Sequence, residues 1–142
     1  MSEITELTKL MYIEDETDIR VVAEIALSQI AGFTVKICAS GNEGLESLEN
    51  FRPQLILLDV MMPGMDGPQV LEKIQQLQEF CDTPVVFITA KAQIEEINKL
   101  KTLGAIDVIT KPFNPMTLGD EIKTIWQRHY DDSKRQSQCR SR

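Results

Sequence analysis

The stretch LILLDVMMPGMDGPQV, residues 55–70, runs four apolar residues directly into the carboxylate of Asp59. The loop that follows contains Pro63, Gly64 and Gly67, so the backbone is expected to turn sharply there. A continuous apolar run is typical of a strand that is buried on both faces, as in the middle of a parallel sheet. The stretch therefore predicts a central strand that ends in a charged side chain.

The rest of the chain alternates short apolar strands with amphipathic helices. Strands are predicted at residues 9–13, 33–37, 54–59, 84–89 and 106–110. The first two predicted helices cover 17–31, ending before Gly32, and the segment from the cap Ser40 to about Asn50. The third helix begins near Pro68 and has its apolar stripe at Leu71, Ile74 and Leu77. The fourth begins near Ile94, ends near Gly104 and has its stripe at Ile94, Ile97 and Leu100. The fifth opens at Asn114–Pro115 and has its stripe at Leu118, Ile122, Ile125 and Trp126.

This alternation predicts an α/β fold with one doubly wound, five-stranded parallel sheet and helices on both faces. Right-handed crossovers leave few topologies, and the strand order 2-1-3-4-5 places the half-polar strand 33–37 at an edge. Residues 1–130 are expected to form one domain, and residues 131–142 a short basic tail without fixed structure.

Composition excludes several classes of function. The chain of 142 residues carries a formal net charge of −7, so a broad surface for nucleic-acid phosphates, and direct DNA binding with it, is not expected. No run approaches the ~20 apolar residues of a membrane span, so no membrane association is expected. The first residues do not resemble a secretion signal, which favours a cytoplasmic location.

Polar side chains stand at the predicted ends of neighbouring strands. Glu14 and Asp15 follow the first strand, Asp59 ends the third, Thr89 the fourth, and Lys111 follows the fifth. In a parallel sheet these ends share one edge, where such folds bind ligands. Three carboxylates there repel one another unless a proton or a cation intervenes, and Mg²⁺ is the oxygen-seeking cation that such a group suits. Asp59 is then placed to attack phosphorus and form an aspartyl phosphate, with Lys111 neutralising oxygen charge.

Each of these residues also has an ordinary explanation when it is taken alone. An acidic residue after a strand often caps a helix, as Asp15 or Glu16 would, and Lys111 before Pro112 suits a plain turn. Thr89 fits the end of any strand. The gathering of all five residues at one edge favours a functional site.

Four motifs together resemble the receiver domain of two-component response regulators. They are MYIEDETDIR, LILLDVMMPGMDG, VVFITA and GAIDVITKPF, and the resemblance covers residues 8 to about 128. It implies the flavodoxin-like receiver fold, with Mg²⁺ as cofactor. It also implies that Asp15 and Asp59 bind the metal directly, Glu14 through water, and Met61 through its backbone carbonyl.

The resemblance further implies that Asp59 accepts a phosphoryl group from a histidine of a sensor kinase or phosphotransfer protein. Thr89 matches the hydroxyl that moves on phosphorylation, Ala90 the small residue beside the phosphoryl group, and Lys111 the phosphate-binding lysine. One departure is Val108, where many members carry Tyr or Phe, so the signal is expected to leave through the fourth helix. The protein would then switch an unidentified protein partner without turning over a substrate of its own, beyond losing its own phosphoryl group.

Three alternatives stay open at this point. The chain resembles stand-alone receivers, but it also fits a receiver fragment of a longer multidomain regulator. A phosphatase of the haloacid dehalogenase type would want a second aspartate where Met61 stands. A flavodoxin-like electron carrier would want a phosphate-cradling loop where the acidic EDETD lies.

Overall fold

The structure, a computed structural model, describes residues 5–91 and 93–133 and confirms the predicted α/β architecture. Five parallel strands form a sheet in the order β2-β1-β3-β4-β5, as predicted. They are β1 (Lys9–Ile13), β2 (Thr34–Cys38), β3 (Leu55–Asp59), β4 (Val85–Thr89) and β5 (Asp107–Thr110). All five carboxyl ends therefore meet at one edge of the sheet, which we call the rim.

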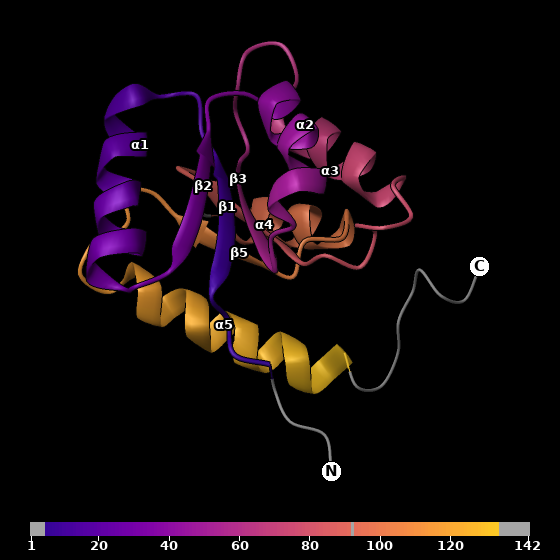
Figure 1. The fold of residues 1–142 in the computed structure, drawn as a ribbon. Helices are drawn as coiled ribbons and strands as arrows, with labels where there is room; N and C mark the ends of the chain where they lie inside the picture. Colours follow the sequence, from indigo (N-terminus) through magenta and orange to yellow (C-terminus); the bar gives the residue numbers. More distant parts are fainter. Residues whose placement is uncertain (1–4, 92, 134–142) are drawn as a thin grey trace.

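Helices cover both faces of this sheet (Figure 1). They are α1 (Thr17–Glu24), the π-helix η1 (Ile25–Ile30), α2 (Gly41–Phe51), α3 (Gly67–Gln75), α4 (Ile94–Thr102) and α5 (Leu118–Ser133). Because neighbouring residues of a strand point to opposite faces, Tyr12 packs with α1, η1 and α5 in one apolar layer. Ile13 packs with α2, α3 and α4 in the other. Every residue of β3 and β4 is buried, which explains their unbroken apolar runs.

Strand β2 lies at the edge, as its alternating sequence predicts. Thr34 is exposed, whereas Val35 and Ile37 pack against the layer of α1 and α5. Ser40 caps α2 as expected, because its Oγ accepts a hydrogen bond of 3.1 Å from the amide of Glu43.

The helix predicted over residues 17–31 changes geometry halfway. It begins as α1 and continues as η1, in which the amide of Ala31 donates to the carbonyl of Ala26 at 3.1 Å, five residues earlier. The helix stops at Gly32, whose φ of 84° is a conformation that glycine adopts without strain. The predicted end is thus confirmed, but the wider π-turn was not foreseen.

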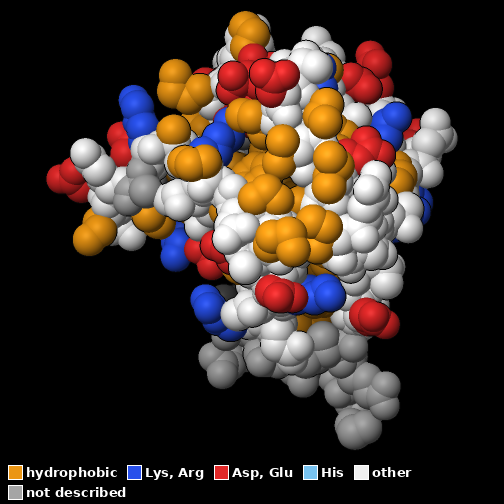
Figure 2. All heavy atoms as spheres, turned by 90° about the vertical axis from the view of Figure 1, so that its left-hand side faces the viewer, with side chains coloured by type: hydrophobic (Ala, Val, Ile, Leu, Met, Phe, Trp, Pro, Cys, Tyr) orange, Lys and Arg blue, Asp and Glu red, His pale blue; other side chains and the backbone are white. Residues whose placement is uncertain are grey.

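Figure 2 shows hydrophobic side chains gathered on the face of the molecule that carries α1. Among the exposed large apolar residues are four from this helical segment, namely Val21, Val22, Ile25 and Ile30. The inner side of the same segment is fully buried at Ala23, Ala26 and Leu27. The segment is therefore apolar over much more of its circumference than burial in this chain requires.

Three helix predictions were wrong in detail. Helix α3 ends at Gln75, so Leu77 lies beyond it and is 41% exposed. Ile94 begins α4 but is 76% exposed, and of the predicted stripe only Leu100 is fully in the core. Helix α5 begins at Leu118, because residues 115–117 form a turn in which the side chain of Asn114 accepts from the amide of Met116 at 2.9 Å.

The segment before β1 is tied to the amino-end edge of the sheet, opposite the rim. The side-chain oxygen of Gln54, just before β3, accepts hydrogen bonds from the amides of Thr8 (2.7 Å) and Lys9 (2.8 Å). The indole of Trp126 in α5 donates to the carbonyl of Thr5 at 2.8 Å. Residues 5–8 are thus held by both the sheet and α5.

Helix α5 continues to Ser133, three residues past the predicted domain limit at residue 130. The remainder of the predicted basic tail, residues 134–142, lies outside the described residues. Within 5–91 and 93–133, the helices are too short or too polar to cross a lipid bilayer.

Candidate functional site

The rim brings together three charged side chains from three strands. Lys111, just after β5, places its Nζ 3.1 Å from Oδ1 of Asp59 and 3.0 Å from Oε1 of Glu14. Asp59 ends β3, and Glu14 follows β1, its immediate neighbour in the sheet. Glu14 and Asp59 are both buried, with 0% and 4% of their surface exposed. A single ammonium group therefore bridges two buried carboxylates.

Asp15 completes an acidic group at this place. Carboxylate oxygens of Glu14, Asp15 and Asp59 all lie within 4.8 Å of one another, and Asp15 is the least buried of the three. One lysine does not balance three carboxylates, so the group has the donor atoms and the excess negative charge that a hard divalent cation requires. The residues present therefore fit Mg²⁺.

Several donors hold the carboxylate of Glu14. Its Oε1 accepts from the hydroxyl of Tyr12 at 3.0 Å as well as from Lys111, and its Oε2 accepts from the amide of Glu16 at 3.2 Å. Burial of the ring, reinforced by the charge of Glu14, raises the pKa of Tyr12 above its usual value, so its hydroxyl keeps its proton. The guanidinium of Arg20 donates to the backbone carbonyl of Glu14 at 2.9 Å.

The charge of Asp59 is disfavoured in this setting. Burial, followed by the neighbouring charge of Glu14, raises the pKa of Asp59 from 3.8 to about 6, although Lys111 opposes the shift. Burial by itself lowers the pKa of Lys111, but the hydrogen bonds and charges of Glu14 and Asp59 outweigh burial and raise it above its ordinary value. Lys111 thus stays charged, and in the absence of a cation Asp59 holds its proton more tightly than an exposed aspartate.

The loop after Asp59 folds back against the end of β3. The amide of Gly67 donates to the carbonyl of Val60 at 2.8 Å, and a Cβ at residue 67 would lie only 2.5 Å from the carbonyl oxygen of Asp59. Only glycine allows this approach at residue 67. Asp66 then caps α3 by accepting from the amide of Gln69 at 3.0 Å.

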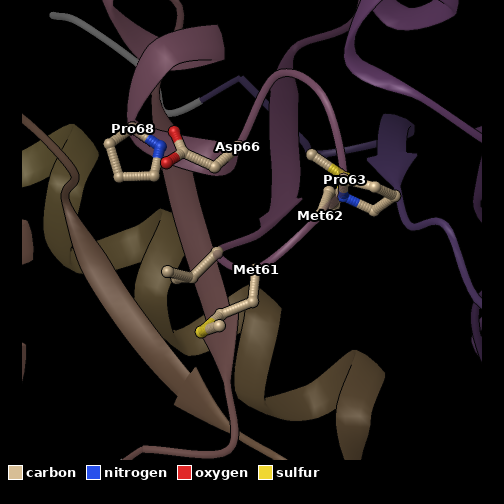
Figure 3. Close-up of a pocket in the computed structure, with 6 residues that line it drawn as sticks. Met61, Met62, Pro63, Asp66 and Pro68 are labelled. Atoms are coloured by element: carbon tan, nitrogen blue, oxygen red, sulfur yellow. The ribbon is translucent and has the colours of Figure 1, made fainter.

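An apolar hollow of ≈ 440 Å³ opens on this loop. Val60, Met61, Met62, Pro63, Asp66 and Pro68 line it. Figure 3 shows Met61 on one side of the hollow and Asp66 and Pro68 on another. The side chain of Met61 is exposed, so a binding role for this residue rests on its backbone carbonyl, which stays a prediction.

The end of β4 supplies the remaining predicted residues. Thr89 is buried, and its Oγ1 accepts from the amide of Lys91 at 3.1 Å. Ala90 is exposed beside it, and the amide of Lys111 donates to the carbonyl of Thr89 at 2.8 Å, which joins β4 to the loop after β5. Val108 is half-buried and packs against the layer of α2, α3 and α4.

Tyr12 and Arg20 contact the site, but the sequence alone did not identify them. Tyr12 lies on β1, two residues before Glu14, which follows the strand, so alternation along the chain places both side chains on the same side of the sheet. That spacing was the available signal, and an aromatic residue inside an apolar strand normally indicates only core packing.

Comparison with known proteins identifies relatives over most of the chain. A family model described as the response regulator receiver domain matches residues 10–123. The fold is similar to that of the chemotaxis protein CheY4 of Vibrio cholerae, with a TM-score of 0.77 and 29% identity over 84% of this chain and 99% of that one. It is also similar to a putative response regulator of Chloroflexus aurantiacus, with a TM-score of 0.74 and 30% identity over 85% and 99% of the two chains.

Curated relatives are longer. The chain is 37% identical over 120 residues to a probable transcriptional regulator, ycf27, of Porphyridium aerugineum, and 36% identical to that of Cyanophora paradoxa. In each case the match covers 84% of this chain and 48% of the relative, so the chain spans about half the length of these relatives.

Proposed function

The chain belongs to the response regulator receiver domain family, and from this premise we propose that Asp59 accepts a phosphoryl group. The donor is a phosphohistidine of a sensor kinase or histidine phosphotransfer protein. A carboxylate oxygen of Asp59 forms the new bond to phosphorus, and the bond between phosphorus and the imidazole nitrogen breaks with its electron pair left on the imidazole. The observation that supports this proposal is the contact of 3.1 Å between Asp59 and Lys111 within the acidic group.

Mg²⁺ is the proposed cofactor. Asp15, Asp59 and the backbone carbonyl of Met61 would hold the ion directly and Glu14 through water, which agrees with the oxygen donors gathered there. When bound, the ion supplies positive charge that offsets the repulsion between Asp59 and the incoming phosphoryl oxygens.

The residues of the chain itself perform the remaining tasks. Lys111 offers its ammonium to a phosphoryl oxygen, and its raised pKa keeps it charged for that purpose. Among the described residues, the hydroxyl of Thr89 accepts one hydrogen bond, from the amide of Lys91, and it can donate its own proton to the added group. Ala90 has no side chain beyond Cβ and leaves room for the phosphoryl group.

The phosphorylated protein is proposed to act by binding a protein partner in the cytoplasm, without catalytic turnover of a separate substrate. The curated relatives are named transcriptional regulators, and this chain spans about half of their length. That observation supports a second candidate, in which the chain is the receiver part of a longer regulator. The expectation that the described domain does not itself contact DNA stays a prediction.

Phosphorylation by a small phosphoramidate in the presence of Mg²⁺ tests the proposal. Intact mass should rise by one phosphoryl group in the wild type, and chelation of the metal should prevent the rise. Asp59→Asn should stay unmodified, whereas the matched control Asp66→Asn, which removes a carboxylate from the same loop but keeps a capping side chain, should be modified normally. Equal modification of wild type and Asp59→Asn would contradict Asp59 as the acceptor.

Beryllofluoride, a phosphoryl mimic, tests the roles of the neighbouring residues. With Mg²⁺ it should shift the amide signals of residues 59, 89 and 111 in the wild type and leave the spectrum of Asp59→Asn unchanged. Turnover of a generic phosphate ester would instead favour a phosphatase.

A further inference from the structure

We infer that Tyr12 is a positioning residue of the site, because its hydroxyl holds the carboxylate of Glu14 in place while Lys111 engages Asp59. This inference rests on the proposed function, since it concerns how the acidic group is kept ready for Mg²⁺ and a phosphoryl group. Tyr12 is uncharged and is not among the predicted metal ligands, but by this inference it contributes to the site.

The position of Tyr12 is unusual for a tyrosine. Its ring is completely buried in the layer of α1 and α5, yet its hydroxyl reaches the rim and donates to Oε1 of Glu14 at 3.0 Å. A phenylalanine would fill the same core space, so packing alone does not explain the hydroxyl. A buried hydroxyl needs a partner, and here that partner is a functional carboxylate.

Glu14 depends on the hydroxyl of Tyr12 because its other strong donor, the ammonium of Lys111, is shared with Asp59. A carboxylate has about four positions for hydrogen bonds, and Glu14 fills three with the hydroxyl of Tyr12, the ammonium of Lys111 and the amide of Glu16. Lys111 also contacts Asp59 at 3.1 Å. When Lys111 turns toward a phosphoryl group on Asp59, Oε1 of Glu14 keeps Tyr12 as its donor, and the carboxylate stays in the same orientation.

Loss of the hydroxyl should therefore affect the metal rather than the fold. In Tyr12→Phe, Oε1 of Glu14 has Lys111 as its sole donor among the described residues. The carboxylate then gains freedom to rotate and holds Lys111 more tightly. Removing a residue that orients a metal-binding side chain commonly weakens metal affinity by roughly 10- to 100-fold, and we expect the lower end of this range.

Titration of Mg²⁺, followed by amide spectra, measures this effect directly. Tyr12→Phe should bind Mg²⁺ roughly tenfold more weakly than the wild type while its metal-free spectrum keeps the dispersion of a folded protein. Tyr130→Phe is the matched control, because it removes a tyrosine hydroxyl that bonds to Thr5 Oγ1 at 3.1 Å, and its Mg²⁺ affinity should equal that of the wild type. Tyr12→Met provides a second variant without the hydroxyl.

A double-mutant cycle with Glu14→Gln separates positioning from general damage. If Tyr12 acts through Glu14, Tyr12→Phe should cost little further affinity in the Glu14→Gln background. Unchanged affinity in Tyr12→Phe, or the same loss in both backgrounds, would overturn the inference while leaving phosphorylation of Asp59 intact. A wild type that neither binds Mg²⁺ nor is phosphorylated would overturn the proposed function itself.

Discussion

At the scale of single residues, Asp59 stands in a setting that works against its own charge. It is buried, it faces Glu14 and Asp15, and one ammonium, that of Lys111, offsets them. Ionisation of Asp59 therefore destabilises the folded, metal-free protein. Under the proposed function, the same imbalance would give the site its affinity for Mg²⁺, and the bound ion would then stabilise the folded state.

The raised pKa of Asp59 predicts that, in the presence of chelator, Asp59→Asn increases the free energy of unfolding by an amount that depends on pH. Unfolded Asp59 ionises near 3.8, but the folded side chain does so at about 6, so the folded state loses relative stability as pH rises between these values. At neutral pH the loss is about 3 kcal/mol, and Asp59→Asn should recover most of it. Below pH 3.8 both forms are neutral and the gain should vanish.

Urea unfolding at neutral and acidic pH measures this difference. Asp66→Asn serves as the control, because it removes a partly exposed carboxylate from the same loop. An Asp59→Asn variant that is less stable than wild type at neutral pH would contradict the expectation that the ionised Asp59 destabilises the folded protein.

Gly67→Ala should destabilise the protein. A Cβ there would approach the carbonyl oxygen of Asp59 in β3 to 2.5 Å and Cε1 of Phe87 in β4 to 2.9 Å, and both of these residues are buried. Overpacking of this kind costs about 1–3 kcal/mol. The control is Gly64→Asn, since residue 64 has open space around it and a φ of 76° that asparagine tolerates. Thermal unfolding of both variants checks the expectation, and equal melting temperatures would contradict it.

The charged residues at the rim could be predicted from the sequence, because apolar runs show where each strand ends. Asp59 and Lys111 each follow such a run, and parallel strands must align their ends. It did not predict that Glu14 is completely buried or that Tyr12 bonds to it. Those facts depend on how side chains from different strands settle against one another, which spacing along one strand does not encode.

At the scale of elements, the helices deviate from their predictions at their ends. Helix α4 begins at Ile94 as predicted, but Ile94 is 76% exposed, so the apolar spacing there includes a residue that the core does not cover. Apolar periodicity says which residues share a helix face, whereas the start of the helix is decided by local backbone hydrogen bonds. The turn held by the side chain of Asn114 is such a local hydrogen bond, and it delays the start of α5 to Leu118.

Two substitutions in α4 should therefore have unequal costs. Leu100→Ala removes a side chain that is 4% exposed and should cost about 2–4 kcal/mol in unfolding free energy. Ile94→Ala alters a side chain that is 76% exposed and should stay within about 0.5 kcal/mol of wild type. Urea denaturation of the pair tests this, and a large loss in Ile94→Ala would mean that the residue is covered.

At the scale of the whole molecule, the carboxyl ends and the amino ends of the strands carry different features. The rim, at the carboxyl ends, carries the charged site. At the amino ends, the side chain of Gln54 accepts hydrogen bonds from the amides of Thr8 and Lys9, an arrangement that we call the clamp. The strand order was predictable, because the alternating strand belongs at an edge and right-handed crossovers fix the rest. The clamp was not, since glutamine at the start of a strand has no fixed partner in a sequence.

Gln54→Ala should loosen the amino-end edge. It leaves the amides of Thr8 and Lys9 without their side-chain acceptor. Because the bond to Thr8 is exposed and the bond to Lys9 is part-buried, water can replace the acceptor, and each lost hydrogen bond should cost about 0.5–1.5 kcal/mol. Faster hydrogen exchange at these two amides is the expected signature. Gln54→Glu keeps the acceptor oxygen and should protect them better, so equal exchange in both variants would argue against the clamp.

The π-turn of η1 has a consequence for how this chain is compared with its relatives position by position. An i→i+5 turn takes up one residue more than an α-turn along the same length of helix. Relatives whose corresponding helix is α-helical throughout should therefore need one residue fewer between Asp15 and Gly32, and their alignments should show a single gap within Ile25–Ile30. Such an insertion or deletion would leave the positions of Glu14 and Asp15 before the helix, and of Gly32 after it, unchanged.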